Sequence, residues 1–155
     1  MRAVIQRVNQ ASVSGGGKVA SIQQGLCVLL GIAAEDTEED LEYIIQKTLH
    51  LKAFSGENEE ERWKRSVVDL QGEILLVSQF TLHAAFKGQG RVSFHRSMPP
   101  DRSRELFHLA IDKFQENYRQ NAVKACVFGS YMNVSLVNDG PVTFIIDSKS
   151  PKVSY

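Results

Sequence analysis

The chain has 155 residues, of which 18 are basic and 18 acidic, so its formal charge at pH 7 is zero. This length suits a single domain, which we expect over residues 1–147 with a short loose tail at 148–155. A domain of this size buries enough apolar surface to be stable without a metal or a disulfide. A neutral chain has no overall field that attracts nucleic acid or membrane, so a polyanion must be held by a local patch. No apolar run reaches membrane-spanning length and the first residues do not resemble a targeting peptide, which predicts a cytoplasmic protein without membrane contact.

Strand patterns dominate the beginning of the chain. Residues 2–8 predict a short strand, and the glycine-rich stretch "SVSGGGKVAS" predicts a hairpin after it. Although "GGGK" suggests a phosphate-binding loop, Lys18 is followed by Val19 instead of Ser or Thr, so the Walker pattern is not met. The continuous apolar run 26–32 predicts a strand that is covered on both faces.

A helix is predicted next, because Thr37 and Asp40 fit a capping box and apolar residues recur at helical spacing over 41–49. The acidic run "GENEEERW" at 56–63 indicates a solvated loop. Residues 73–82 then predict a strand that begins apolar and ends polar. Sheets commonly present functional groups at such an end.

A second helix is predicted from Pro100, with Phe107 and Phe114 on one apolar stripe. Two final strands, 131–138 and 142–147, flank the turn-like "NDGP". The order of strands, helix, strand, helix and strands suits neither a helical bundle nor a doubly wound fold. It predicts helices packed on a sheet that has a second β layer.

The polar end of the strand 73–82 offers one candidate for catalysis. Extended geometry would place Gln79, Thr81 and His83 on one face, and Ser78 and Phe80 on the other. The pair of Thr81 and His83 resembles a nucleophile and its base. No acidic residue close in sequence could orient the imidazole, so the alternative is a hydroxyl that is satisfied by the backbone.

The histidines and cysteines do not suggest a metal site. His50, His83, His95 and His108 lack metal-binding spacing, and no cysteine pair accompanies them. Cys27 and Cys126 both stand in apolar contexts, where we expect buried, reduced thiols. We therefore expect neither metal nor cofactor.

The segment 86–96 combines Lys87, Arg91 and Arg96 with glycines and aromatic residues. This mixture can hold a phosphate backbone and stack the bases of single-stranded nucleic acid. In an otherwise neutral chain, three cations also fit a flexible basic loop.

Four stretches together resemble the D-aminoacyl-tRNA deacylase family: "MRAVIQRV" at the start, "SQFTL" at 78–82, the "KG..R.SF" loop, and "NDGPVT" at 138–143. The resemblance runs from Met1 to about Asp147. It implies a three-layer α/β fold with helices packed on a two-layer, largely antiparallel or mixed β structure, assembled as a homodimer. The implied activity is hydrolysis of the ester that links a D-amino acid, or glycine, to the 3′ end of tRNA.

The resemblance assigns chiral selection to the "GPVT" motif. Gly140 and Pro141, joined by a cis peptide bond, enter the site of the partner subunit, where their main-chain carbonyls leave no room for an L side chain. Arg7 orients this segment and Met132 supports it. The substrate-binding residues implied at this motif are Arg7, Met132, Gly140, Pro141, Val142 and Thr143.

The resemblance also places Ser78, Gln79, Phe80 and Thr81 in the floor and wall of the pocket, with Phe80 near the terminal adenosine. Lys87 and Arg91 match the basic loop near the tRNA end, and His83 and Val92 stand where the family usually has an aromatic residue and a proline. Because an aminoacyl ester is already activated, a positioned water, the backbone N–H groups of 79–81 and the ribose 2′-hydroxyl suffice for hydrolysis. Covalent attack by Thr81 is the alternative.

Two other functions are weighed against this one. A related deacylase subclass clears L-alanine from mischarged tRNA with a trans Gly-Pro and a roomier pocket, but its motifs differ from "SQFTL" and "GPVT". A nucleic-acid-binding protein without catalysis is the second alternative, since a role as a DNA-replication factor has been proposed for this fold. The "GPVT" loop argues against it, since binding a nucleic-acid phosphate backbone needs cations and not a neutral main-chain pocket.

Overall fold

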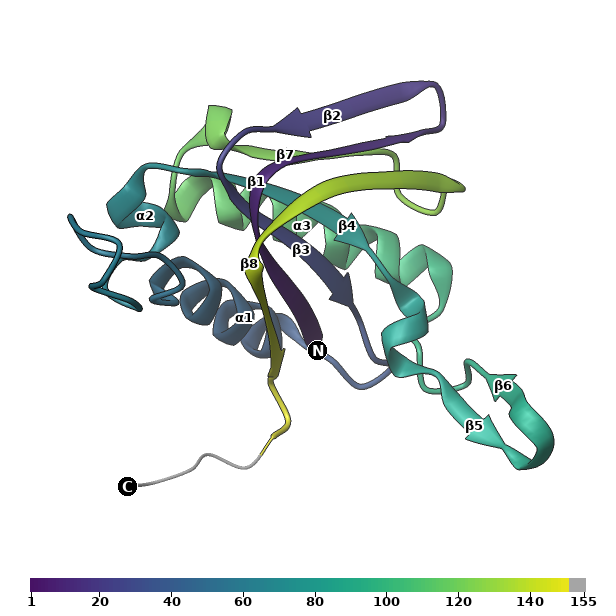
Figure 1. Cartoon of the computed structure of the whole chain (residues 1–155). Helices are drawn as coiled ribbons and strands as arrows, with labels where there is room; N and C mark the ends of the chain where they lie inside the picture. The colour runs from purple at the N-terminus through teal and green to yellow at the C-terminus, as the bar shows by residue number, and fades with distance from the viewer. Residues whose placement is uncertain (151–155) are drawn as a thin grey trace.

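The computed structural model describes residues 1–150, which form one six-stranded mixed sheet, one two-stranded sheet and a layer of helices (Figure 1). The strands are β1 (Arg2–Gly15), β2 (Lys18–Ile22), β3 (Gly25–Gly31), β4 (Glu73–Ser78), β5 (Ala85–Lys87), β6 (Arg91–Ser93), β7 (Val123–Ala125) and β8 (Met132–Asp147). The helices are α1 (Glu38–His50), α2 (Val67–Leu70) and α3 (Pro100–Asn117), with short 3₁₀ turns η1 (Phe80–His83), η2 (Gly88–Gly90) and η3 (Gln120–Ala122).

The large sheet is organised around β1. One edge of β1 pairs antiparallel with β8 along nearly its whole length, and the other edge pairs first with β3 and then with β2. Beyond β3, the strands β4 and β7 continue the sheet in parallel. Because β2 also contacts β4 and β7, the sheet curls back on itself into a nearly closed, barrel-like shape.

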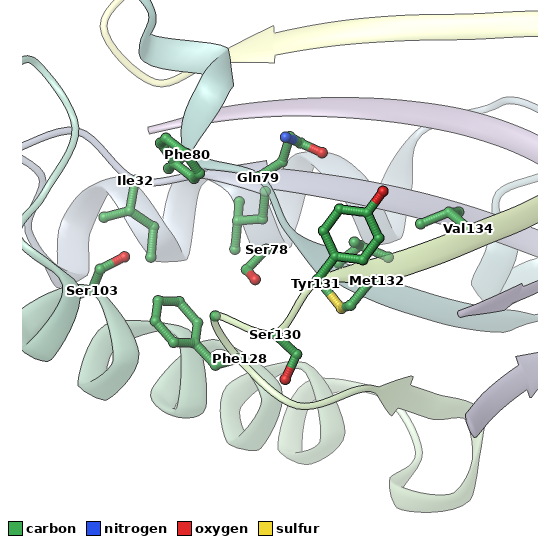
Figure 2. Close-up of a pocket in the computed structure, with 13 residues that line it drawn as sticks. Ile32, Ser78, Gln79, Phe80, Ser103, Phe128, Ser130, Tyr131, Met132 and Val134 are labelled. Carbon is green, nitrogen blue, oxygen red and sulfur yellow. The ribbon is translucent and has the colours of Figure 1, made fainter. Parts of the chain in front are cut away.

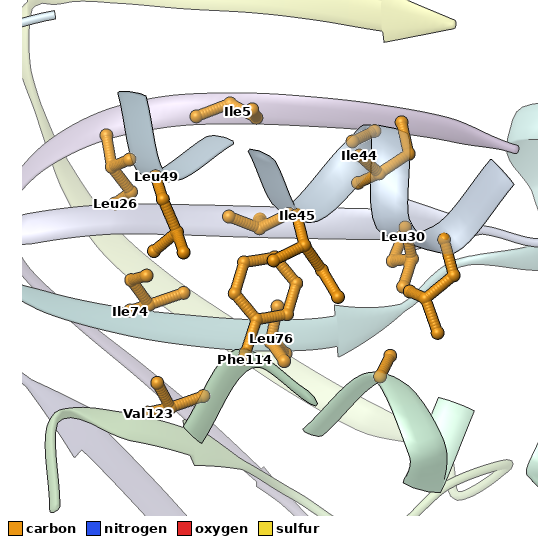
Figure 3. Packing of buried hydrophobic residues seen from close by; sticks show 14 of the residues in the cluster. Ile5, Leu26, Leu30, Ile44, Ile45, Leu49, Ile74, Leu76, Phe114 and Val123 are labelled. Atoms are coloured by element: carbon orange, nitrogen blue, oxygen red, sulfur yellow. The ribbon is translucent and has the colours of Figure 1, made fainter. Parts of the chain in front are cut away.

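Two apolar clusters hold this architecture together. The larger one lies between the sheet and the helices α1 and α3, and its members include Ile44, Ile45, Leu49, Phe107, Phe114, Leu26, Leu30, Ile74 and Leu76 (Figure 3). The smaller one fills the inside of the curled sheet with Val8, Ala11, Val13, Ile22, Cys27, Leu75 and Val77. Each buried Val, Leu, Ile or Phe side chain stabilises the fold by about 1.5–3 kcal/mol. The predicted helices on a β structure are confirmed, and the two β layers are parts of one curled sheet.

Several local predictions are confirmed. The glycine-rich stretch forms the β1–β2 hairpin, and β3 is buried along nearly its whole length because helices cover one face and the curled sheet the other. Helix α1 begins after Thr37, whose N–H donates to the Asp40 carboxylate at 2.9 Å. Helix α3 begins at Pro100 and buries Phe107 and Phe114. The first strand is longer than predicted, since β8 supplies pairing partners as far as Gly15.

The strand predicted over 73–82 is wrong in its last third. Strand β4 ends at Ser78, and residues 80–83 form the 3₁₀ turn η1. Gln79 makes the last bond, from its N–H to the Leu30 carbonyl at 2.9 Å, and β3 ends one residue later, so no neighbouring strand continues the ladder. The predicted alternation of side chains over 78–83 therefore does not exist.

The turn predicted at "NDGP" is also wrong, because β8 is one continuous strand from Met132 to Asp147. Gln6 pairs with Thr143 and Val8 pairs with Asn138, so Arg7 alone lies opposite four residues, 139–142. We call these four residues the Gly-Pro bulge. As the family resemblance implied, the Gly140–Pro141 peptide bond is cis, and Gly140 has a φ of 129° that favours glycine.

Near both chain ends the structure contains ion pairs and a hydrogen bond that the sequence did not suggest. The Met1 ammonium is buried against the Asp36 carboxylate and donates to the Ser148 hydroxyl at 2.7 Å, while the Lys149 ammonium lies 2.9 Å from the Asp40 carboxylate. The start of the predicted loose tail is thus held in place, and residues 151–155 lie outside the described part of the chain. No helix within residues 1–150 is long and apolar enough to cross a membrane.

The two thiols differ in burial. Cys27 is fully buried inside the curled sheet, and this burial raises the pKa of its thiol to about 11. Cys126 is only partly buried, because it lies beside β2 at the margin of the smaller cluster. The prediction of a buried, reduced thiol is confirmed for Cys27, and the burial predicted for Cys126 is wrong.

Candidate functional site

A cavity of about 250 Å³ opens where β4 ends, between η1, the segment 128–131 and the start of β8 (Figure 2). We call it the β4 cavity. Three of the predicted floor residues, Ser78, Gln79 and Phe80, line it, and so does Met132. Thr81 is not part of its lining; it is exposed, and its hydroxyl accepts a hydrogen bond from the Gln79 side-chain amide.

The sequence did not single out the opposite wall of the β4 cavity. That wall is made by Ser103, Phe128, Ser130, Tyr131 and Val134, and Figure 2 shows the Phe128 ring facing the cavity and the Tyr131 ring at its rim. Tyr131 is 92% exposed, an unusual state for a large aromatic side chain. The only sequence signal was an aromatic pair in an otherwise loop-like stretch, "VFGSYM".

Several contacts hold η1 at the edge of the β4 cavity. The Ser97 hydroxyl donates to the Phe80 carbonyl at 2.9 Å, and the Phe80 ring packs edge-on against Phe94 with 4.9 Å between centroids. A nitrogen of the His83 ring, Nε2, lies 3.1 Å from the Gly31 carbonyl oxygen. Gly31 has no room for a side chain, since a Cβ there would lie 2.8 Å from the Leu82 Cβ. The turn is therefore a fixed part of the cavity.

The turn η1 also determines which backbone N–H groups at the edge of the β4 cavity can bind a ligand. The Gln79 N–H is already bonded to the Leu30 carbonyl, so it cannot serve a ligand. Among residues 1–150 we find no acceptor for the N–H groups of Phe80 and Thr81, as is usual at the start of a helical turn. Of the three predicted oxyanion donors, two remain available.

The suggested dyad of Thr81 and His83 does not form. Within the described residues no hydrogen bond joins their side chains, because His83 points to the Gly31 carbonyl and Thr81 pairs with Gln79. The extended geometry on which the dyad depended is replaced by the 3₁₀ turn.

The Gly-Pro bulge is held from both sides by polar groups. The Arg7 guanidinium donates through Nε to the Asp139 carbonyl at 3.2 Å and pairs with the Asp139 carboxylate at 3.0 Å. The Asn138 side chain accepts from the Val142 N–H at 2.9 Å and donates to the Thr143 hydroxyl at 3.2 Å. Arg7 and Asn138 thus both contact the bulge, and the sequence did not single out Asn138.

The bulge belongs to a different cavity from Ser78, Gln79 and Phe80. Arg7, Gly140, Pro141 and Val142 line a cavity of about 670 Å³, which residues of the loop at 54–65 line on its other side. Met132, expected to support the Gly-Pro segment, lines the β4 cavity. One chain therefore does not bring the two predicted halves of the site together.

Lys87 and Arg91 lie opposite each other on the β5–β6 hairpin, which projects from the body of the molecule (Figure 1). Both are exposed, and Phe86 beside them is 81% exposed. No Asp or Glu occurs between Gln79 and Pro100, so the hairpin is locally basic in a neutral chain. Among residues 1–150, no cluster of His, Cys, Asp or Glu has the arrangement of a metal site.

Comparison with known proteins identifies relatives of this chain. A family model described as D-Tyr-tRNA(Tyr) deacylase matches residues 4–147. The D-aminoacyl-tRNA deacylase of Schizosaccharomyces pombe is 48% identical over 150 residues, which are 96% of this chain and 99% of that protein. A solved structure described as c-Myc DNA Unwinding Element Binding Protein is 42% identical with a TM-score of 0.89, covering 98% of this chain and 100% of that chain.

A second solved structure, a probable eukaryotic D-amino acid tRNA deacylase, has a TM-score of 0.80 at 19% identity and covers 94% of this chain and 98% of that chain. At this identity the likeness concerns the fold alone. The family match, by contrast, spans the strands, the helices and both cavities described above. The chain therefore belongs to the D-Tyr-tRNA(Tyr) deacylase family.

Proposed function

We propose that this protein hydrolyses the ester bond of D-aminoacyl-tRNA, and of glycyl-tRNA mischarged on tRNA(Ala), to release free tRNA and the amino acid in the cytoplasm. Family membership and the name of the relative from Schizosaccharomyces pombe support this activity. The observation that carries it is a cavity at whose edge two backbone N–H groups have no acceptor within residues 1–150, in a chain that also exposes a Gly-Pro bulge.

We further propose that the working form is a homodimer in which the Gly-Pro bulge of each subunit completes the β4 cavity of the other. The bulge lies on β8, whose outer edge has no strand partner within residues 1–150. Ile145 on the same strand is 71% exposed, and Gly140 and Pro141 are exposed too. An unpaired edge of this length is usually covered, and a symmetric dimer covers both copies at once.

Selection for D-amino acids would then be steric. Gly140 has no side chain and Pro141 has no N–H, so the bulge presents mainly carbonyl oxygens to a ligand. Its shape leaves little freedom, because a Cβ on Gly140 would lie 2.6 Å from the Val142 Cγ2. A rigid main-chain wall rejects an L side chain of any type, whereas glycine passes.

The chemistry needs little from side chains. A water attacks the ester carbon, the bond to the ribose 3′-oxygen breaks, and the 2′-hydroxyl helps to pass a proton to that leaving oxygen. The N–H groups of Phe80 and Thr81 would stabilise the developing oxyanion, with Ser78 and Gln79 forming the floor and the Phe80 ring beside the adenosine. Lys87 and Arg91 would contact tRNA phosphates.

One observation favours a second activity, binding of nucleic acid without catalysis. The exposed, basic β5–β6 hairpin carries Phe86 and could contact single-stranded DNA, and one similar structure is described as a DNA-binding protein. We rank this below hydrolysis, because it gives the β4 cavity and the bulge no role. The L-alanine-specific deacylase ranks lower still, since its motifs differ from those of this chain.

Deacylation of a matched pair of substrates tests the proposal. D-Tyr-tRNA should be hydrolysed and L-Tyr-tRNA spared, while glycyl-tRNA should be cleaved because it has no side chain to exclude. Equal rates on the D and L esters would contradict chiral selection. Tight, salt-sensitive binding of DNA with no hydrolysis of any ester would favour the second activity.

A further inference from the structure

Trp63 is the only tryptophan in the chain, and it ends the acidic run that the sequence presents as a solvated loop. Its backbone φ is 60°, a conformation that bulky L residues seldom adopt. Its side chain is 49% exposed, so half of this large ring is kept away from solvent. A loop that only has to be solvated requires neither feature.

The contacts of Trp63 lie on both sides of the Gly-Pro bulge. Arg7 Cζ lies 5.9 Å from the centroid of the Trp63 ring, in a cation–π arrangement, and Arg7 is the residue of β1 opposite the bulge. Phe144, just after the bulge on β8, packs edge-on against Trp63 with 6.0 Å between centroids and 83° between the planes. The ring thus bridges the two strands that the bulge separates.

The Trp63 ring restrains the part of Arg7 that its hydrogen bonds do not restrain, namely a face of the guanidinium. Two groups bind the guanidinium through its N–H atoms, since Nη1 donates to the Ala53 carbonyl at 2.7 Å and Nε donates to Asp139. Hydrogen bonds in the plane of the guanidinium do not restrain its faces, but a ring stacked near it does. The Arg7 side chain is only 16% exposed.

The loop that carries Trp63 is itself ordered by its backbone. The Gly56 N–H donates to the Glu61 carbonyl at 2.7 Å, and Phe54 and Arg65 form a bridge at the base of the loop. The Arg65 side chain donates to the Ser55 carbonyl at 2.6 Å. The loop therefore holds Trp63 at a fixed place against Arg7.

We propose that Trp63 is a positioning residue for chiral selection, which acts through Arg7 to hold the Gly-Pro bulge in the shape that excludes L substrates. This inference rests on the proposed function of the bulge. The competing role for Trp63 is stacking on a tRNA base in the 670 Å³ cavity, which it also lines. Arg7, Arg62 and Arg65 line that cavity together with Glu59 and Asp139, so its charge does not decide between the two roles. The contacts of the Trp63 ring with Arg7 and Phe144 favour positioning.

The test compares Trp63→Ala, Trp63→Phe and a control, Tyr43→Ala, on D-Tyr-tRNA and L-Tyr-tRNA. Tyr43 makes a similar cation–π contact, 5.6 Å from Lys47 Nζ, but on α1, outside the cavity that contains the bulge. Trp63→Ala should lower the ratio of D to L rates (kcat/KM) about tenfold, the scale of one partly buried cation–π contact. Trp63→Phe should restore most of the ratio, and Tyr43→Ala should leave it at the wild-type value.

The fluorescence of the single tryptophan gives a second measurement on a chain that keeps Trp63. Gly140→Ala forces Val142 and Arg7 to shift, because the added Cβ would lie 3.3 Å from Arg7 Nη2. If the bulge and Trp63 are coupled, the emission of Trp63 should change in this variant and stay unchanged in Tyr43→Ala. An identical emission spectrum in the wild type, Gly140→Ala and Tyr43→Ala would overturn the coupling. This measurement stands even if Trp63→Ala proves unable to fold.

The outcomes separate this inference from the proposed function. A wild-type protein that treats D and L esters alike contradicts the function itself. A wild type that discriminates, together with a Trp63→Ala variant that discriminates equally well, overturns the inference alone. A variant that only raises KM for D-Tyr-tRNA, with normal hydrolysis of D-tyrosyl-adenosine and a normal D to L ratio, would assign Trp63 to nucleotide contact and also overturn it.

Discussion

The two cavities of this chain are built in different ways. The floor of the β4 cavity is the end of a strand whose central residues are buried between the helices and the curled sheet. The Gly-Pro bulge is an excursion on the exposed edge strand β8, shaped by polar contacts from Arg7 and Asn138. The first depends on the hydrophobic core, and the second on a few side chains near the surface.

This difference suggests that stability and selectivity reside in separate parts of the molecule. A change in the core beneath β4 leaves a void or a clash and costs about 2–5 kcal/mol for a large side chain. A change in the bulge removes little buried apolar surface, so the fold survives while the presented carbonyls move. Variants in the core beneath β4 should therefore lose stability, whereas variants in the Gly-Pro bulge should lose selectivity between D and L substrates.

The largest expected effect comes from disabling each half separately. Gly140→Val places a branched side chain where a Cβ alone would lie 2.6 Å from Val142 Cγ2, and Phe80→Ala removes the ring from the β4 cavity. Each homodimer should lose nearly all hydrolysis of D-Tyr-tRNA. When the two variants are refolded together, one site of each mixed dimer is intact, and activity should return to about a quarter of wild type per total sites.

The control for this experiment is the same pair of variants mixed after folding without exchange of subunits, which should stay inactive. Mixed dimers that form and recover nothing would contradict a site shared between subunits. A fully active monomer would contradict it as well.

An intermediate effect, on stability alone, is expected for Asp40→Asn. Burial by itself would raise the pKa of the Asp40 carboxyl, but hydrogen bonds from the Ser148 hydroxyl, the Thr37 N–H and the Lys149 ammonium hold it well below its ordinary value of 3.8. Losing the charge should lower the free energy of unfolding by about 1–3 kcal/mol at neutral pH. The ratio of D to L hydrolysis should not change, because Asp40 lies in neither cavity.

The pH dependence of the Asp40 effect has a definite sign. A carboxyl whose pKa is lower in the folded state stabilises the protein above its unfolded value of 3.8, and this contribution disappears as the pH falls toward the folded pKa. Melting curves of wild type and Asp40→Asn should differ at neutral pH and converge in acid. A difference that grows in acid would show that another group dominates.

The smallest effect is expected for Thr81→Ala. The Thr81 hydroxyl is exposed and pairs only with the Gln79 side chain among residues 1–150, so its loss should reduce kcat by less than about fivefold. Rapid quenching should trap no acyl-enzyme. A covalent adduct on Thr81, or a loss as large as that of Gly140→Val with the fold intact, would restore the nucleophile that the geometry disfavours.

Elements that depend on local pattern were predicted well from the sequence. The capping box at Thr37 and Asp40, the apolar stripe of α3 and the buried run of β3 all appear where expected, because periodicity reports which face is buried. Among the predicted elements, those that were wrong concern residues 79–83 and 139–142. There the conformation depends on where a neighbouring strand ends or on how many residues face Arg7, and neither is a property of the segment itself.

By itself, the sequence determined the family, the helices α1 and α3 and the buried strand β3, while the residues assigned to the two halves of the site remain predictions. Only the tertiary structure decided that the Gly-Pro segment is a bulge instead of a turn, that Gln79 has no free N–H, and that Trp63 lies against Arg7. The physical reason is that amino-acid patterns encode local burial and conformational preference. Strand register, cavity walls and the partners of a guanidinium arise from contacts between segments that lie far apart along the chain, such as Arg7 with Trp63 and with Asp139.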